Sequence, residues 1–553
     1  MNRITLRKQL ARWMALAGKA STSNWSTQQM IDHLESTKGV ERRQFLQLAG
    51  AGLALAACSP RRNPNPQEAF QLSASTSNNL RIVVLGAGFA GLSAAHFLRK
   101  SGLSCEVYEA RDRVGGRVVT KNHFNKDGMF VELGAEFVDT VHTDLIKLAG
   151  ELGVEVQDYI HPIAGLAEEV YFFDQKVSNP DLFLGEFKKF AGLVLADTTS
   201  IREGKDLTLP VLGQPGPAEA AWLDQISLAE YLERKKNQGL SEDFVELINV
   251  MYLGMMGLET DRQSVYNLLI LMDPYGSDIA LYGDSDESKR ILGGNGRLVR
   301  ALADTVEKHT PIHLDHALTQ VKDDGAGFTL EFARKGQSTK QVRADILIVT
   351  IPIPILKTIR GLENLNLTPA KKAAIRSLGY ATNAKFTIGF TERVWRNKGH
   401  NVPPNYGTVW SNGLFPEVRD SSNNQRGAHG IILNYLGGKT GEVIPPSLKE
   451  KTLQHLEVMY PGIRKFHDGN LNLQHWTSDP FAGGSYICPK PGHYSAMGGF
   501  ENPVELRGRM VFAGDSFSGE FGGYMNGAIQ TGKRAAQIVA EASKVKAVPG
   551  SKS

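Results

Sequence analysis

The stretch LRIVVLGAGFAGLSAAHFLRKSG, from Leu80 to Gly102, decides the fold. An apolar run that predicts a strand is followed by Gly86, Gly88 and Gly91 in a G-x-G-x-x-G pattern, and then by residues with helical periodicity. In this setting the first glycine permits a tight turn, the second lets the backbone approach a pyrophosphate, and the third lets helix and strand pack closely. The free N–H groups at the start of the helix favour the charge of a diphosphate. The stretch therefore predicts an α/β dinucleotide-binding domain.

An acidic residue follows at the expected distance. The next apolar segment, SCEVYEA, carries Glu109 near its end, eighteen residues after Gly91. A carboxylate at this place accepts a hydrogen bond from a ribose hydroxyl, and it disfavours the 2′-phosphate of NADP. The basic turn Arg111 to Arg117 comes next, and simple nicotinamide dehydrogenases do not need one. We therefore expect a longer, deeply buried dinucleotide.

The composition is that of a globular protein with several domains. The chain has 553 residues, of which 41% are hydrophobic and 22% charged, so two to four domains are expected. The formal net charge of +4 comes from the basic residues 1–57, and the rest of the chain is close to neutral. This distribution argues against a nucleic-acid partner.

The cysteines and histidines predict neither a disulfide framework nor a metal site. Cys58, Cys105 and Cys488 are the three cysteines of the chain and are far apart in sequence. His313 and His316 have a suggestive spacing, but they lie in IHLDHAL, which we interpret as a strand. Residues three apart on a strand face opposite sides, so we predict no metal.

The N-terminal 58 residues are expected to be an export signal. In RRQFLQLAGAGLALAACS, Arg42 and Arg43 precede an uncharged run, Phe45 to Ala57, which at thirteen residues is too short to span a bilayer. The paired arginines resemble a twin-arginine signal, and Leu55 to Cys58 resembles a lipobox. We expect export by the twin-arginine route to a periplasmic or membrane-anchored location, with a possible lipid anchor at Cys58 as the sole membrane contact. The alternative is an amphipathic docking helix, and the role of residues 1–40 stays open.

The dinucleotide motif and the basic turn together resemble the FAD-binding signature of the flavin amine oxidase superfamily. This superfamily includes monoamine and polyamine oxidases, L-amino-acid oxidases, protoporphyrinogen oxidases and carotenoid desaturases. The resemblance runs in the family's order from Leu80 to Ala542, and the segment Arg509 to Ala536 is its strongest part. It implies a mixed α/β fold in which a Rossmann-like FAD-binding domain is interleaved with a substrate-binding domain of mixed sheet and helices.

The resemblance also implies how the chain is divided. A linker is expected at 59–79, and the FAD-binding domain is expected at 80–140, 287–350 and 471–545. The substrate-binding domain, with a helical insertion that roofs the pocket, would take 141–286 and 351–470, and 546–553 would be a tail.

The cofactor expected from the resemblance is FAD. Asp515 would lie near the ribityl-diphosphate region, and the Met525 N–H would meet the flavin's C2 carbonyl at the start of a helix, whose positive end stabilises a reduced, anionic flavin. The residues expected to contact FAD are Gly86, Gly88, Ala90, Gly91, Glu109, Ala110, Arg111, Gly116, Arg117, Gly134, Ala135, Glu136, Leu318, Gly514, Asp515, Tyr524 and Met525.

Four residues are expected to carry the chemistry. Lys385 matches the family lysine that holds a water molecule against flavin N5, although a surface lysine is the alternative. Tyr486 and Tyr524 resemble the paired aromatic rings that guide an amine nitrogen, and Trp476 would line the same wall. Core packing is the alternative for the tyrosines. Ser485 stands where covalent monoamine oxidases have a cysteine, so FAD should be bound non-covalently.

The substrate is expected to be an amine rather than an α-amino acid. Many L-amino-acid oxidases pair the substrate carboxylate with an arginine where this chain has Phe137, and phenylalanine cannot form such a pair. Glu136 could instead attract a cationic amine. Arg290 or Arg419 could still supply a carboxylate clamp from another segment.

We therefore expect an FAD-dependent oxidase that converts a primary or secondary amine into an imine while O₂ becomes H₂O₂; its partners would be a small-molecule amine or amino acid and O₂. The alternatives are an L-amino-acid oxidase, a desaturase or protoporphyrinogen-type oxidase, and a lipid-anchored binding protein that keeps FAD structurally. A homodimer is a candidate oligomeric state that the sequence does not decide.

Overall fold

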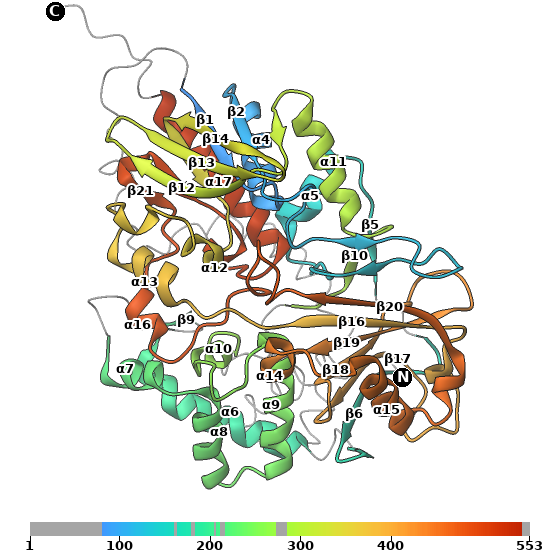
Figure 1. Ribbon diagram of the computed structural model, residues 1–553. Helices are drawn as coiled ribbons and strands as arrows, with labels where there is room; N and C mark the ends of the chain where they lie inside the picture. Colours follow the sequence, from blue (N-terminus) through green and yellow to red (C-terminus); the bar gives the residue numbers. More distant parts are fainter. Residues whose placement is uncertain are drawn as a thin grey trace, which may run out of the picture.

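The computed structural model describes residues 80–159, 163–178, 183–203, 206–210, 216–272 and 285–544. Two large sheets lie in different regions of the molecule, and helices pack on both of them. The chain passes between the two sheets several times (Figure 1). The predicted export signal, linker and tail fall outside the described residues. Within the described ranges, no helix is both long enough and apolar enough to cross a lipid bilayer.

The first sheet contains the predicted dinucleotide motif. Its strand order is β11 (Ile312–His313), β2 (Cys105–Tyr108), β1 (Ile82–Leu85), β15 (Ile346–Val349), β22 (Met510–Phe512) and β21 (Val504–Glu505), and every pair except β21–β22 is parallel. All four residues of β1 and of β15 are buried, as expected for central strands covered on both faces. This confirms the strand predicted within Ala344 to Leu356, although its second half forms the short helix α12 (Ile353–Leu356).

Helices cover one face of this sheet and a smaller sheet covers the other. The helices are α4 (Phe89–Lys100), α5 (Thr143–Glu151), α11 (Gly296–Glu307) and α17 (Met525–Lys544), which share one hydrophobic cluster with the sheet. The smaller antiparallel sheet consists of β12 (Ala317–Asp323), β13 (Phe328–Arg334) and β14 (Gln337–Ala344). It packs on the sheet together with α12, α13 (Pro369–Ser377) and η5 (Leu362–Asn364). The first sheet is thus the middle of three layers.

The second large sheet has seven strands. Their order is β20 (His467–His475), β16 (Ala384–Phe390), β19 (Gly430–Leu436), β18 (Glu417–Asp420), β17 (Asn405–Ser411), β6 (Ala167–Phe173) and β7 (Lys176–Val177). Helix α15 (Leu448–Met459) packs on it. A mainly helical group forms its own core from α6 (Leu184–Thr198), α7 (Ala218–Gln225), α8 (Leu228–Asn237), α9 (Glu242–Met256) and α10 (Tyr266–Leu269). This group lies within residues 141–286, where we expected the helical insertion of the substrate-binding domain.

Short elements complete the described chain. Three two-stranded ribbons are formed by β3 (Thr120–Lys121) with β4 (Val131–Glu132), β5 (Val156–Asp158) with β10 (Lys289–Ile291), and β8 (Arg202–Glu203) with β9 (Asp206–Leu207). The remaining turns of helix are α14 (Gly438–Glu442), α16 (His493–Met497), η4 (Thr199–Ile201), η6 (Val394–Arg396), η7 (Ile463–Phe466), η8 (Leu506–Gly508) and η9 (Asp515–Phe517).

The packing moves three of the predicted domain boundaries. Helix α5, expected in the substrate domain, buries its apolar face against the first sheet. Residues 353–374, also expected there, pack under the same sheet. Strand β20 belongs wholly to the second sheet, so the FAD domain does not resume at 471. In each case a boundary estimated from sequence order missed hydrophobic contacts that cross it.

The segment IHLDHAL is not a continuous strand. Strand β11 ends at His313, and Asp315 takes a positive φ of 56° that turns the chain. His313 and His316 therefore both pack on Tyr108, with ring centroids 4.5 Å and 5.5 Å away, instead of facing opposite ways. In the described part of the chain no group of three or more His, Cys, Asp or Glu side chains could hold a metal ion.

Candidate active site

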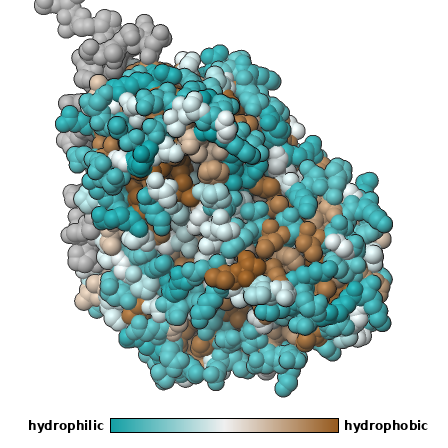
Figure 2. Space-filling view, viewed as in Figure 1, coloured by the Kyte–Doolittle hydropathy of each residue, from teal (hydrophilic) through white to brown (hydrophobic). Residues whose placement is uncertain are grey.

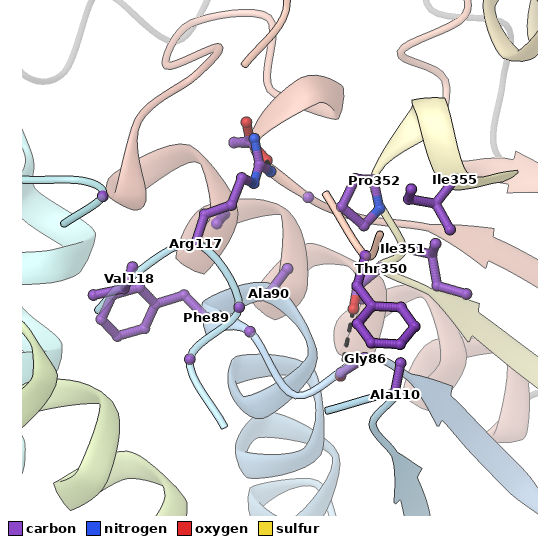
Figure 3. Close-up of a pocket in the computed structure, with 18 of the residues that line it drawn as sticks. Gly86, Phe89, Ala90, Ala110, Arg117, Val118, Thr350, Ile351, Pro352 and Ile355 are labelled. Atoms are coloured by element: carbon purple, nitrogen blue, oxygen red, sulfur yellow. Dashed lines mark hydrogen bonds and ion pairs between the residues drawn. The ribbon is translucent and has the colours of Figure 1, made fainter. Parts of the chain in front are cut away.

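A cavity of about 620 Å³ runs from the first sheet to the second. Figure 3 shows part of its wall, in which the turn after β1 faces the segment after β15. On the surface, a recess lined by hydrophobic residues lies at the place of α12 (Figure 2), and Ile355 of α12 lines the cavity. Every residue expected to contact FAD lines this cavity except Gly91, and so do the four residues expected to carry the chemistry.

The three glycines of the motif occupy the positions that the motif predicts. Gly86 has a φ of +106°, and a Cβ there would lie 2.6 Å from Thr350 Oγ1. A Cβ on Gly88 would meet nothing within 4 Å, because the cavity lies there. A Cβ on Gly91 would lie 1.9 Å from the Gly86 carbonyl oxygen. Gly91 therefore allows helix α4 to pack closely against the turn at Gly86, and it does not line the cavity.

The Glu109 carboxylate accepts hydrogen bonds from backbone N–H groups of the two turns that flank the predicted ribose site. Its Oε2 accepts a hydrogen bond from the Ala87 N–H at 2.7 Å, and its Oε1 accepts one from the Arg111 N–H at 2.9 Å. Burial raises the pKa of the Glu109 carboxyl, while the two N–H donors oppose that rise. Each carboxylate oxygen can accept a further hydrogen bond, so the ribose hydroxyl expected here would still find an acceptor.

An arginine and an aspartate line the cavity and are paired with each other. Arg117 donates to Asp515 Oδ1 and to the Ser485 carbonyl oxygen, which joins the first turn to the C-terminal segment. Asp515 Oδ2 is buried and has no hydrogen-bond partner among the described residues. Such an atom is costly unless a bound group satisfies it. Together with the open space at Gly88, it shows that the residues present fit a dinucleotide cofactor.

The start of α17 also faces this cavity. The helix begins at Met525, as predicted, and Tyr524, Met525 and Ala528 line the cavity wall. The unpaired N–H groups of a helix start carry partial positive charge. The helix start can therefore stabilise an anionic ring system bound in the cavity.

Lys385 points into the cavity from strand β16. All seven residues of β16 are buried, so the strand has no exposed face and the surface-lysine alternative is wrong. The Lys385 ammonium donates to Glu136 Oε2 at 2.7 Å and to the Glu132 carbonyl oxygen at 3.3 Å. It also lies 5.1 Å from the ring centroid of Tyr435, which lines the same wall.

The aromatic residues expected at the substrate end lie together. Tyr486 donates its hydroxyl to the Met255 carbonyl oxygen of α9, and burial raises its pKa. A Cβ on Gly523, the neighbour of Tyr524, would lie 3.4 Å from the Cβ of Tyr486, so the two tyrosine segments are in contact. Trp476 is buried and donates its indole N–H to the Leu133 carbonyl oxygen at 3.0 Å. These three aromatic residues line the same cavity as Lys385.

Neither arginine proposed as a carboxylate clamp faces the cavity. Arg290 is paired with Glu136, and Arg419 is paired with Glu417 and, at 3.0 Å, with Glu287. The arginines that do line the cavity are Arg111, Arg117 and Arg360. Glu136 is already shared by two cations, so it is not a free carboxylate for an amine, contrary to our expectation.

The sequence did not reveal several cavity residues. Thr350 follows β15 and donates to the Leu85 carbonyl oxygen at 2.8 Å, and its hydroxyl also lies 3.4 Å from the Gly86 carbonyl oxygen. Figure 3 shows the contact between Thr350 and Gly86 as a dashed line. Asn383, Tyr435 and Glu287 line the wall near Lys385. None of them lies in a recognisable motif. A polar residue directly after a buried central strand is the one signal that could have pointed to Thr350.

The comparisons with known proteins agree with this geometry. The profile of the family "Flavin containing amine oxidoreductase" matches residues 89–540, and the chain belongs to this family. Membership makes it a flavin-dependent enzyme of the amine oxidoreductase type and implies FAD as its flavin.

The individual relatives are distant but extend over most of the chain. A flavin-containing amine oxidase of Oncorhynchus mykiss is 24% identical, over 84% of this chain and 86% of its own length. An L-amino-acid oxidase of Naja atra is also 24% identical, over 85% and 89% of the two chains. Cyclohexylamine oxidase from Brevibacterium oxydans IH-35A has the same fold, with a TM-score of 0.67 at 21% identity, covering 84% of this chain and all of that one. A putrescine oxidase bound to putrescine gives 0.66 at 21% identity, covering 83% and 99%.

Proposed function

We propose that the protein is an FAD-dependent amine oxidase that converts a primary or secondary amine into an imine. One observation carries this proposal: Lys385, Trp476, Tyr486 and Tyr524 line the same cavity as the turn of the dinucleotide motif. A protein that keeps FAD only as a structural part would not need this assembly of a buried cation and aromatic rings.

Bound FAD would accept a hydride equivalent from the carbon that carries nitrogen and pass the electrons to O₂. A primary amine and O₂ then give an imine and H₂O₂, and water converts the imine into an aldehyde and ammonia. We assign to Tyr486 and Tyr524 the guidance of the amine nitrogen, because aromatic ring faces attract cations and exclude water. Lys385 would hold a water molecule at the reacting end, and Trp476 would support the wall.

We further propose that FAD is bound non-covalently. Ser485 lines the cavity at the position where covalent monoamine oxidases have a cysteine. Its one hydroxyl proton has two acceptors within the protein, Asn383 Oδ1 at 2.9 Å and the Ala381 carbonyl oxygen at 3.2 Å. The nearby Cys488 is buried between other segments and does not line the cavity.

The proposed substrate is an amine without an α-carboxylate. Phe137 lines the cavity, and the two arginines that could have clamped a carboxylate are held in buried ion pairs. A carboxylate at this end would therefore find no guanidinium to pair with it in the two-pronged way that such a clamp needs. L-amino-acid oxidation is the alternative, because the relative from Naja atra is such an enzyme.

Peroxide release from a substrate panel tests this proposal. The panel contains monoamines, diamines and polyamines, L-amino acids, and apolar substrates without nitrogen. We expect H₂O₂ with one or more amines and little with L-amino acids. Release with L-amino acids alone would replace our proposal with the alternative, and oxidation of apolar substrates alone would indicate a desaturase-type enzyme.

We also propose export by the twin-arginine route, with the protein acting outside the cytoplasm. Support comes from Arg42 and Arg43 before the apolar run, and from Cys58 as a candidate lipid anchor. A non-covalent flavin must be inserted during folding, so export of a folded protein suits this cofactor. Replacing both arginines with lysine should retain the enzyme in the cytoplasm of its host, as cell fractionation would show.

A further inference from the structure

Glu136 places a different cation on each of its two carboxylate oxygens. Arg290 donates to Oε1, and Lys385 donates to Oε2 at 2.7 Å. The side chains of Glu136, Arg290 and Lys385 are only 2%, 3% and 7% exposed. Burial alone would raise the pKa of the Glu136 carboxyl, but the charges of Lys385 and Arg290 outweigh it and lower the pKa. The three side chains thus form one buried, bridged ion cluster.

Two of the three N–H donors of Lys385 are used within the protein, and one remains for the cavity. A lysine ammonium has three N–H donors. Lys385 uses one on Glu136 and one on the Glu132 carbonyl oxygen, and no third hydrogen-bond acceptor is found for it among the described residues. Since Lys385 lines the cavity, the remaining N–H is the one available to water or substrate there.

Arg290 is fixed from its other side, which makes the bridge rigid. Its guanidinium lies 4.2 Å from the ring centroid of Tyr159 and 5.7 Å from that of Phe137. It comes from β10, which pairs with β5. Because Arg290 is itself held in place, it restricts the movement of Glu136. Glu136 in turn fixes the position of Lys385.

We propose that Glu136 is a positioning residue that, together with Arg290, holds Lys385 with one N–H directed into the cavity. This inference rests on the proposed function of Lys385 at the reacting end. Removing one partner from a buried ion pair leaves an uncompensated charge. Without Glu136, the lysine would lose its orientation and its charge compensation.

A double-mutant cycle on the FAD-loaded enzyme tests whether Glu136 acts through Lys385. The variants are Glu136→Gln, Lys385→Met and their combination, and the first readout is the rate constant of flavin reoxidation by O₂. We expect Glu136→Gln to slow reoxidation by about tenfold when Lys385 is present, and by less than about twofold in the Lys385→Met background. Glu136→Asp keeps the charge but shortens the side chain, so its reoxidation rate constant should lie between those of wild type and Glu136→Gln. If Glu136→Gln does not fold, Glu136→Asp takes its place in the cycle.

The second readout is independent of turnover. Acetic anhydride labelling of the holoenzyme, read by mass spectrometry, reports how well Lys385 is held. We expect its labelling rate to rise at least about fivefold in Glu136→Gln, while the buried Lys235 and Lys371 stay unlabelled as controls against unfolding. Glu417→Gln, which removes a buried carboxylate paired with Arg419, is the matched control and should change neither readout.

Each failure has its own signature. If Lys385→Met reoxidises as fast as wild type, the function assigned to Lys385 is wrong. If Lys385→Met is slow but Glu136→Gln slows both backgrounds equally, or leaves Lys385 labelling unchanged, the positioning role of Glu136 is wrong while the proposed function stands.

Discussion

Gly88 and Gly91 differ in what a methyl group would meet, and this difference separates cofactor binding from folding. At Gly88 a Cβ would enter the cavity, whereas at Gly91 it would lie 1.9 Å from a backbone oxygen. We expect Gly88→Ala to leave the stability of the apoprotein within about 0.5 kcal/mol of wild type but to weaken FAD binding at least about tenfold. We expect Gly91→Ala to lower the free energy of unfolding by about 2 kcal/mol or more, the size of an overpacked site.

Isothermal titration with FAD and urea unfolding of the apoprotein measure the two effects. Weakened FAD binding without lost stability in Gly91→Ala, or the reverse in Gly88→Ala, would contradict the assignment of these glycines.

Whether the role of a single residue could be predicted depends on how far away in sequence its interaction partners lie. Gly86, Gly88 and Glu109 could be identified because the strand, turn and helix that define their motif lie within thirty residues of sequence. The cluster of Glu136, Arg290 and Lys385 could not, because its partners are 154 and 249 residues apart in sequence. The same distance hid the role of Arg290, which the sequence left open as one of two candidates for a carboxylate clamp.

Helix α13 is attached to the segment before β21 by a buried lysine, and this attachment should depend on pH. Lys371 donates to the carbonyl oxygens of Phe500 and, at 2.8 Å, of Asn502. Burial lowers its pKa from 10.5 to about 7. Between these values the folded protein binds fewer protons than the unfolded chain, so this group makes the free energy of unfolding rise with pH.

We expect the rise from pH 7 to pH 9 to be about 2 kcal/mol smaller in Lys371→Met than in wild type. Urea unfolding at several pH values measures it, with Lys372→Met, on the less buried neighbour in α13, as the control. Parallel pH dependence in wild type and Lys371→Met would show that Lys371 keeps its ordinary titration when folded.

Whole elements were predicted well where their burial pattern was strong. The start of α17 at Met525 and the buried strand β15 followed from the sequence. The domain boundaries did not, because α5 and residues 353–374 pack on the first sheet through contacts that no local pattern shows. The turn at Asp315 was missed because its positive φ belongs to a residue other than glycine.

The molecule as a whole should gain stability from its cofactor, because the cavity is lined by segments from both ends of the described chain. Arg111 binds Asp479 at 2.6 Å and Arg117 binds Asp515, so both ends already meet there. If FAD is non-covalent, a free FAD concentration one hundred times its dissociation constant adds about 2.7 kcal/mol to the free energy of unfolding. Thermal unfolding at increasing FAD measures this gain, and a flavin that stays attached to the denatured chain would contradict it.

The central claim is that an amine delivers its electrons to FAD in the cavity beside Lys385, Tyr486 and Tyr524. Anaerobic mixing of the holoenzyme with single substrates, followed by flavin absorbance, tests it most directly. We predict bleaching by one or more amines, with the rate reduced at least about tenfold in Tyr524→Ala, and no bleaching by L-amino acids at equal concentration. A flavin that no amine bleaches, or that α-amino acids alone bleach, would contradict the account.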